Sequence, residues 1–444
     1  MTLKFIDLFA GVGGFHLALK ELGCECVFAS ELQPDLRELY EINHGMKCHG
    51  DINNVIIEKD IPPHDILCAG FPCQPFSQAG KQMGFNDDKE RGNLFYRIME
   101  ILNYHSPEYV FLENVPNLKS HDNHRTYETI HKLLSERYEV ADAIISPHFF
   151  GIPQHRNRIY IVGRLKSKGG LKGFTFPDTS ERPVCDINKI IVTDDTDYMS
   201  LREITRQHIA AWEEFIKLVT KHKKQLPTFP IWAMEFGADY SYEGAAPYYQ
   251  QDRQLRGKKG KFGTVLGGAS KDDLLRDLPV YAQDKPKTGR QFPDWKKQFI
   301  RQNRKFYEEN KEWIDEWIVK IQVPGFENSH QKFEWNCGDE ENPTIYDKII
   351  QFRPSGIRVK LPTYSPALVL TTTQIPILPW VKTPDGKIGR YMTRKEGARL
   401  QCLESLKEYP DTIASAFKAF GNAVNVEVVK RIAQNLIFNR DETN

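Results

Sequence analysis

The chain has 444 residues, of which 40% are hydrophobic and 11% aromatic, so it contains enough apolar material for two or three folded domains. No apolar run reaches the roughly 18 residues that a membrane-spanning helix needs, and the N-terminus lacks the basic and apolar regions of a secretion signal. We therefore expect a cytoplasmic protein that does not associate with membranes.

Charge is distributed unevenly along the chain, although the formal net charge is only +1. Residues 1–165 carry 16 Lys and Arg against 22 Asp and Glu, whereas the remainder carries 44 against 37. A polyanion would therefore bind the later part of the chain. The eight cysteines form no paired CxxC knuckles, so we predict reduced thiols and no metal site.

Short apolar runs alternate with segments of helical periodicity through the first part of the chain. The expected strands are 4–8, 26–29, 65–69, 109–112, 138–145 and 158–162, and the expected helices are 14–22, 35–43, 93–104 and 127–137. This alternation is typical of an α/β fold with a doubly wound, mostly parallel sheet covered by helices.

The pattern changes after Gly163, where a Lys- and Gly-rich stretch leads into sequence rich in Trp, Tyr, Pro and charge. We expect a smaller, irregular second domain there, with helices at 209–221 and 295–319 and a basic loop at 258–268. An amphipathic helix is predicted from Gly421 to Ile437, and it would pack back on the first domain. The expected regions are therefore 1–170, 171–390 and 391–444.

A glycine-rich turn, Asp7–Phe15, links the first expected strand to the first helix, as in nucleotide-binding α/β proteins. The turn is neither a GxGxxG fingerprint nor a phosphate loop, and it carries no Lys, so a ligand without phosphates fits better. Glu31 follows the second strand, where an acid could accept hydrogen bonds from ribose hydroxyls, and Asp51 could accept from an adenine amino group. Glycine turns and acids are common in α/β proteins, so these residues alone do not identify the ligand.

Cys73 lies between two prolines, directly after the expected strand 65–69. Ligands bind at the carboxyl ends of strands in such sheets, and a reactive thiol needs partial exposure and an electropositive setting. A structural cysteine would more often lie inside the strand, as Cys68 does.

A carboxylate and two arginines are predicted at the same edge of the sheet. Glu113 follows the strand 109–112, and Arg156 and Arg158 project to one side because side chains alternate along an extended segment. Cations beside a thiol would lower its pKa and neutralise charge that develops on a substrate. The alternatives are a helix cap or salt bridge for Glu113, and a phosphate clamp or surface pair for the arginines.

These motifs occur in a fixed order, and together they closely resemble the 5-methylcytosine DNA methyltransferases of bacterial type II restriction-modification systems. The resemblance covers residues 3–165 and about 352–438. It implies the Rossmann-like fold of methyltransferases that depend on S-adenosylmethionine. The motifs are Phe9-Ala10-Gly11-x-Gly13-Gly14, Pro72-Cys73-Gln74, Glu113-Asn114-Val115, Gln154-x-Arg156-x-Arg158, Arg399-Leu400-Gln401 and Gly421-Asn422-Ala423-Val424.

The resemblance implies that Cys73 adds to carbon 6 of a cytosine, after which carbon 5 takes a methyl group. Glu113 would hold the ring nitrogen 3 and the exocyclic amine, Arg158 the base carbonyl, and Arg156 the surrounding site. Because carbon 6 is shielded within a stacked duplex, the base must flip out of the helix.

The same resemblance assigns residues 1–170 to catalysis and cofactor binding, 171–390 to DNA target recognition, and 391–444 to completing the cofactor pocket. Its DNA-contacting residues would be Gln74, Ser77 and Gln154. Leu32 stands where the family commonly has an aromatic residue, so adenine stacking is weaker here or is supplied by Phe71. The implied cofactor-binding residues are Asp7, Phe9, Gly11, Gly13, Glu31, Leu32, Asp51, Ile52, Leu94, Asn422 and Val424.

The expected partners are double-stranded DNA and a separately encoded restriction endonuclease, and we expect a monomer. An RNA cytosine-5 methyltransferase shares these motifs but usually lacks a long insert like 171–350. A catalytically silent DNA-binding regulator would not need Cys73, Glu113 and Arg158. An amino-methyltransferase would need a Pro-Pro-aromatic motif, which is missing, and a dehydrogenase has only the glycine turn in its favour.

Overall fold

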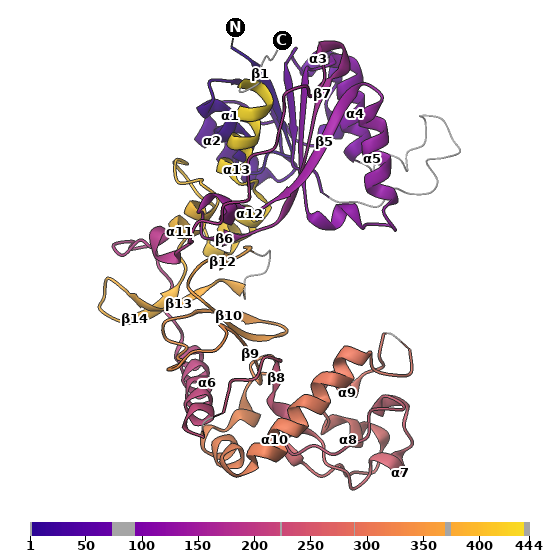
Figure 1. Cartoon of the computed structure of the whole chain (residues 1–444), viewed down its shortest axis with the longest axis vertical. Coiled ribbons are helices and arrows are strands. Elements are labelled where there is room, and N and C mark those ends of the chain that lie inside the picture. Colours follow the sequence, from indigo (N-terminus) through magenta and orange to yellow (C-terminus); the bar gives the residue numbers. More distant parts are fainter. Residues whose placement is uncertain (1, 73–93, 223, 288, 369–373, 439–444) are drawn as a thin grey trace. The chain divides into compact units, whose positions relative to one another are not determined.

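The computed structural model describes residues 2–72, 94–222, 224–287, 289–368 and 374–438. The chain divides into two compact units (Figure 1). The first comprises Met1–Val192, Thr363–Thr372 and Thr393–Asn444, and the second comprises Thr193–Pro362 and Thr373–Met392. No helix in the described part of the chain is long and apolar enough to span a bilayer.

The first unit is built on a six-stranded sheet with the order β2-β1-β3-β4-β7-β5. Its strands are β1 (Lys4–Leu8), β2 (Glu25–Ser30), β3 (Ile66–Ala69), β4 (Tyr109–Asn114), β5 (Tyr138–Ile145) and β7 (Arg158–Leu165). The first four are mutually parallel, and β7 lies antiparallel between β4 and β5. The predicted doubly wound, mostly parallel sheet is confirmed, and the carboxyl ends of β1 to β4 share one edge.

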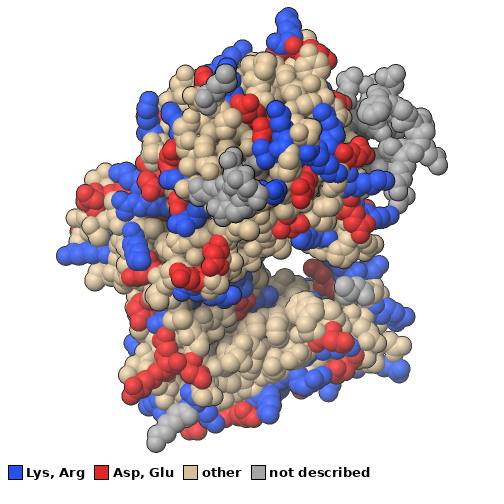
Figure 2. Space-filling view, turned by 45° about the horizontal axis from the view of Figure 1, so that its top comes forward, with Lys and Arg blue, Asp and Glu red and all other residues tan. Residues whose placement is uncertain are grey.

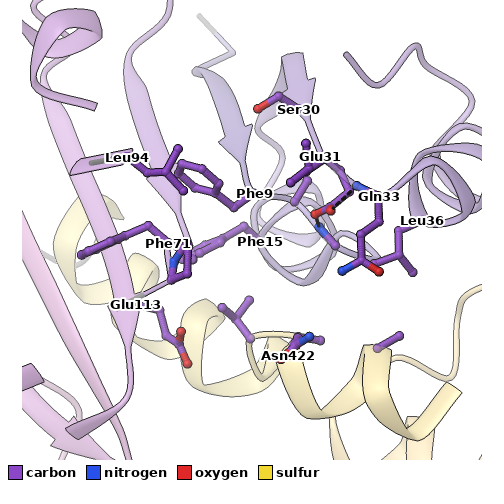
Figure 3. Close-up of a pocket in the computed structure, with 18 of the residues that line it drawn as sticks. Phe9, Phe15, Ser30, Glu31, Gln33, Leu36, Phe71, Leu94, Glu113 and Asn422 are labelled. Carbon is purple, nitrogen blue, oxygen red and sulfur yellow. Dashed lines mark hydrogen bonds between the residues drawn. The ribbon is translucent and has the colours of Figure 1, made fainter. Parts of the chain in front are cut away.

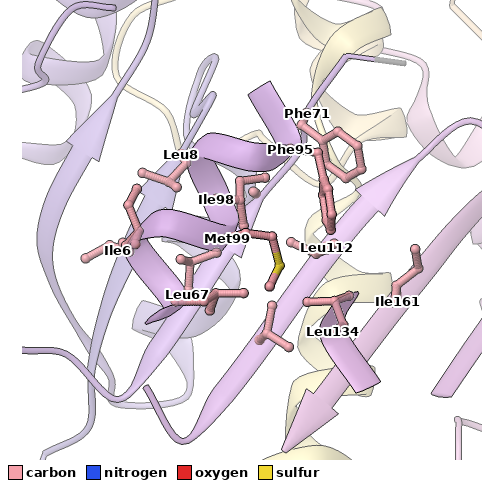
Figure 4. Packing of buried hydrophobic residues seen from close by; sticks show 14 of the residues in the cluster. Ile6, Leu8, Leu67, Phe71, Phe95, Ile98, Met99, Leu112, Leu134 and Ile161 are labelled. Atoms are coloured by element: carbon pink, nitrogen blue, oxygen red, sulfur yellow. The ribbon is translucent and has the colours of Figure 1, made fainter. Parts of the chain in front are cut away.

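Helices cover both faces of this sheet, with α4 and α5 on one face and α1, α2 and α13 on the other (Figure 1). The α4 side holds the main core, in which Ile6 and Leu67 from the strands meet Ile98 of α4 and Leu134 of α5 (Figure 4). The helices of this unit are α1 (Gly14–Glu21), α2 (Pro34–His44), α3 (Ile57–Asp60), α4 (Leu94–His105), α5 (Arg125–Ser135), α11 (Arg394–Leu400), α12 (Ile413–Asn422) and α13 (Val426–Ala433). Through α13, which packs against α1, the chain returns to its beginning.

The first unit extends to Val192 rather than ending at residue 170. The Cys185 thiol donates to the carbonyls of His148 and Ile152, 3.5 and 3.6 Å away, and Arg399 donates to the carbonyl of Ile190 at 3.2 Å. A later segment also rejoins the unit, since β12 (Ser365–Pro366) pairs with β6 (Gln154–His155). The hydrogen bonds of Cys185 and Arg399 join residues 171–192 to the first unit, and the amino-acid composition of the segment does not reveal them.

The second unit has its own sheet, with the order β14-β13-β10-β11-β9-β8, and an aromatic core in which Trp212 stacks on Phe333 at 4.7 Å. Its strands are β8 (Ile231–Trp232), β9 (Lys332–Asn336), β10 (Ile349–Arg353), β11 (Gly356–Lys360), β13 (Ile377–Lys382) and β14 (Ile388–Tyr391). Its helices are α6 (Glu203–Lys221), α7 (Asp252–Leu255), α8 (Lys271–Arg276), α9 (Val280–Gln283) and α10 (Asp294–Ile321). The two helices predicted here correspond to α6 and α10, whereas the sheet, whose strands have two to six residues, was not predicted.

Candidate active site

The turn after β1 brings the backbone close to neighbouring elements. Gly13 has φ +88°, and a Cβ added there would lie 2.1 Å from the Nε2 atom of His44. A Cβ at Gly14 would lie 2.6 Å from the carbonyl oxygen of Val424. Glycine is therefore required at both positions, and Gly13 serves this close packing rather than lining the neighbouring cavity.

A cavity of about 440 Å³ opens at the carboxyl ends of β1 to β4. In Figure 3 its wall includes Phe9, Leu94 and Glu31, and Asn422 reaches it from the C-terminal segment. The structure brings together here all the expected cofactor-binding residues except Asp7 and Gly13. The predicted residues that line it are Phe9, Gly11, Glu31, Leu32, Asp51, Ile52, Leu94, Glu113, Arg156, Arg158, Asn422 and Val424.

Two carboxylates lie on the β2 side of the cavity. Glu31 is 9% exposed, and its two oxygens accept hydrogen bonds from the backbone N–H groups of Gly11 and Gln33, each at 2.9 Å. Asp51 Oδ1 accepts from the backbone and side chain of Asn53 at 3.0 Å. Each carboxylate is thus held in one orientation and retains lone pairs that can accept from a ligand hydroxyl or amine.

Asp7 does not line the cavity, so its expected cofactor contact is corrected. Side chains alternate along β1, and Ile6 and Leu8 face the α4 core while Asp7 points to the opposite face of the sheet. It is 1% exposed, and burial raises its pKa well above the usual range, although the nearby His16 backbone and Tyr40 hydroxyl act in the opposite direction. Asp7 therefore belongs to the interior beneath the turn.

Glu113 and Arg158 form an ion pair on the cavity wall, with 3.0 Å between Arg158 Nε and Glu113 Oε1. Glu113 is only 6% exposed, and burial raises its pKa even though Arg158 and Arg156 act in the opposite direction. The carboxyl therefore accepts a proton more readily than an exposed glutamate does. Only in the protonated form can it donate a hydrogen bond to a ligand nitrogen.

The family model of C-5 cytosine-specific DNA methylases matches residues 3–437. The chain belongs to this family. The resemblance inferred from the motifs is thereby confirmed.

Individual relatives are type II methyltransferases by name. M.HhaI of Haemophilus parahaemolyticus is 47% identical over 180 residues, which are 40% of this chain and 54% of that protein. M.HpaII of Haemophilus parainfluenzae is 48% identical over 184 residues, covering 40% of this chain and 51% of that protein. M.AluI of Cellulosimicrobium cellulans is 29% identical over 491 residues, covering 97% of this chain and 91% of that protein. The first two matches thus span about half the length of the relatives concerned.

Arg156, expected among the catalytic residues of this methylase, is placed as a positioning residue. It is 2% exposed, and its NH1 and NH2 donate to the carbonyls of Gly421 at 2.7 Å and Ala423 at 2.8 Å. Burial lowers its pKa to about 10, so the guanidinium stays charged at neutral pH. It ties the segment that carries Asn422 and Val424 to the edge of the sheet.

Asn114 was not singled out from the sequence, although it directly follows Glu113 in the Glu-Asn-Val motif. It is 4% exposed, and its side chain donates to the carbonyl of Phe71 and accepts from the N–H of Val115, both at 2.8 Å. It thereby connects the end of β4 to the segment that leads into Cys73. Cys73 itself, with Gln74 and Ser77, lies outside the described residues.

Gln154 was expected to contact DNA, but its side chain is completely buried. Its strand β6 pairs with β12, where Gln154 lies opposite Ser365. Because the side chain is buried, the structure places Gln154 inside the first unit instead of on a surface that could contact DNA.

Proposed function

We propose that the chain transfers a methyl group to carbon 5 of a cytosine within a specific short sequence of duplex DNA. The observation that carries the proposal is the Glu113–Arg158 pair, which shares one cavity with the carboxylates Glu31 and Asp51. Such a cavity offers a nucleoside site at one end and a site for a polar heterocycle at the other.

The proposed methyl donor is S-adenosylmethionine, which supplies an electrophilic methyl group when it is bound. The cavity fits this ligand because Glu31 suits two ribose hydroxyls and Asp51 suits the adenine amine. The side chains of Phe9, Ile52 and Leu94 would surround the base. No lysine lines the cavity among the residues that the structure describes, which agrees with a ligand that has no phosphates.

On the cytosine side, the thiolate of Cys73 forms a bond to carbon 6, and Glu113 gives a proton to ring nitrogen 3. Arg158 donates to the base carbonyl. Carbon 5 then takes the methyl group, whose bond to the donor's sulfur breaks. Carbon 5 loses its proton to a solvent base, the bond between carbon 6 and Cys73 breaks, and ring nitrogen 3 returns its proton to Glu113. Because the base must reach the cavity, we also propose that it flips out of the duplex.

The decisive experiment expresses the Cys73→Ala variant and wild type in cells and compares plasmid DNA by bisulfite sequencing. We expect wild type to protect cytosines of one short sequence from conversion and Cys73→Ala to protect none while it still binds DNA. Cys68→Ala is a matched control, since this thiol is buried in β3 and should be dispensable for methylation. Methyl transfer by Cys73→Ala would refute the proposed nucleophile.

The nature of the substrate is tested by offering purified enzyme duplex DNA and tRNA in parallel. Incorporation into tRNA alone would favour the RNA-modifying alternative. The proposal also includes a partner restriction endonuclease, a cytoplasmic location and a monomeric state. Size-exclusion chromatography with light scattering tests whether the protein is a monomer.

A further inference from the structure

Several basic side chains of the second unit have acidic partners. Lys and Arg are interspersed with Asp and Glu on the face of the molecule in Figure 2, so charge alone does not locate a contact with a polyanion. Along α10, for example, Lys305 lies 3.8 Å from Glu309, and Lys320 lies 2.6 Å from Glu214. Such pairs leave little net field for a ligand.

Lys296 and Lys332 differ from this pattern. Lys332, in β9, lies opposite Trp232 of β8, and its Nζ is 5.1 Å from the centre of the Trp232 ring and 5.3 Å from that of Tyr281. Lys296, in the first turn of α10, has its Nζ at 5.3 Å from the same Tyr281 ring and 4.7 Å from the Phe292 ring. Two ammonium groups thus share one aromatic ring.

The shared ring is held in place from beneath. The Tyr281 hydroxyl donates to Glu235, which is completely buried and also binds Arg304 Nε at 2.8 Å. Glu235 is therefore committed to Tyr281, Arg304 and the hydroxyl of Tyr240. Within the described ranges neither Lys296 nor Lys332 has a carboxylate within ion-pair distance.

The electrostatics of the cluster favour a bound anion. Burial lowers the pKa of both lysines, and the charge of Lys296 lowers the pKa of Lys332 further. Contact with ring faces stabilises each ammonium group by roughly 0.5–2 kcal/mol but uses none of its three N–H donors. An anion bound at these groups would accept those donors and reduce the repulsion.

We propose that Lys296 and Lys332, fixed over Trp232 and Tyr281, form a binding site for a backbone phosphate of DNA. This inference rests on the proposed function, which requires the chain to hold duplex DNA. Lysine serves as a point-charge phosphate ligand, and a contact of this kind adds affinity without reading sequence.

The test measures binding of the full chain to duplex DNA over a series of salt concentrations. Each phosphate contact contributes about 0.9 to the slope of log K against log salt. Lys296→Gln and Lys332→Gln should each reduce the slope by about 0.9, which corresponds to about fivefold weaker binding at about 0.15 M salt. Lys332→Arg should keep the wild-type slope, and Lys305→Gln, which removes a paired lysine from the same helix, should leave it unchanged.

An unchanged slope in both glutamine variants would overturn the inference, even if affinity fell, because it would indicate only a packing role. Lysine acetylation of the wild-type protein provides a second test, which holds even if a variant fails to fold. Bound DNA should protect Lys296 and Lys332 from acetylation while Lys305 still reacts. Equal labelling of the two lysines with and without DNA would also overturn the inference. The methylation assay is separate: a wild type that binds with this slope but transfers no methyl group contradicts the proposed function alone.

Discussion

Replacing Arg156 by Met tests whether the two ends of the chain must be tied together to form the cavity. The substitution removes the hydrogen bonds to the carbonyls of Gly421 and Ala423 and keeps a long, unbranched side chain. Two bonds from a charged donor are worth about 3–6 kcal/mol. Burial and the neighbouring Arg158 charge lower the Arg156 pKa from 12.5 to about 10, which corresponds to a cost of about 3 kcal/mol for the charged form that the variant recovers.

The expected net loss of unfolding free energy is therefore about 0–3 kcal/mol, measured by urea denaturation. Cofactor affinity should fall about tenfold or more in calorimetric titration with S-adenosylmethionine, because Asn422 and Val424 lose their anchored backbone. Arg164→Met is the control, since Arg164 pairs with Glu108 at 2.7 Å on the partly exposed end of β7, away from the cavity. Wild-type stability and cofactor affinity in Arg156→Met would refute the reasoning.

Three further substitutions probe the site. Asn114→Ala should lower kcat with little change in the cofactor KM, because it frees the carbonyl of Phe71 ahead of Cys73; steady-state kinetics separate the two effects. Leu32→Trp should tighten cofactor binding by roughly two- to tenfold in the same calorimetric titration, since Leu32 is 67% exposed at the cavity and a ring can stack on adenine. Burial lowers the pKa of His16 to about 3, so the unfolded state binds more protons between about pH 6.5 and 3, and stability falls as the pH drops through this window. Urea unfolding at about pH 7, 5.5 and 4 should show that His16→Asn lessens this fall by up to ~1.4 kcal/mol per pH unit, and an equal pH dependence would contradict the expectation.

The residues that gather at the cavity could be predicted because the fold imposes a simple rule. Parallel strands place their carboxyl ends on one edge, so the residues after β1, β2 and β4 had to approach one another. Glu31 and Glu113 follow directly from that rule. Asn422 and Val424 followed from the resemblance, and the packing of α13 on α1 explains how they reach the cavity.

Other assignments depended on details that spacing does not carry. Asp7 and Phe9 are two residues apart, yet only Phe9 lines the cavity, because the chain leaves the strand between them and turns with φ +57° at Phe9. Gln154 is completely buried, and its strand pairs with the distant Ser365. Contacts between distant segments also place residues 171–192 in the first unit, through the hydrogen bonds of Cys185 and Arg399.

The sequence by itself determined the family, the alternation of strands and helices, and the chemistry available at the edge of the sheet, since these depend on local pattern and ordered motifs. Only the tertiary structure showed that Arg156 donates to the segment that carries Asn422 and Val424, that Asn114 holds Phe71, and that Lys296 and Lys332 lie over one tyrosine. Each of these depends on side-chain direction and on contacts between residues far apart in the chain. Packing sets both, and no short stretch of sequence encodes them.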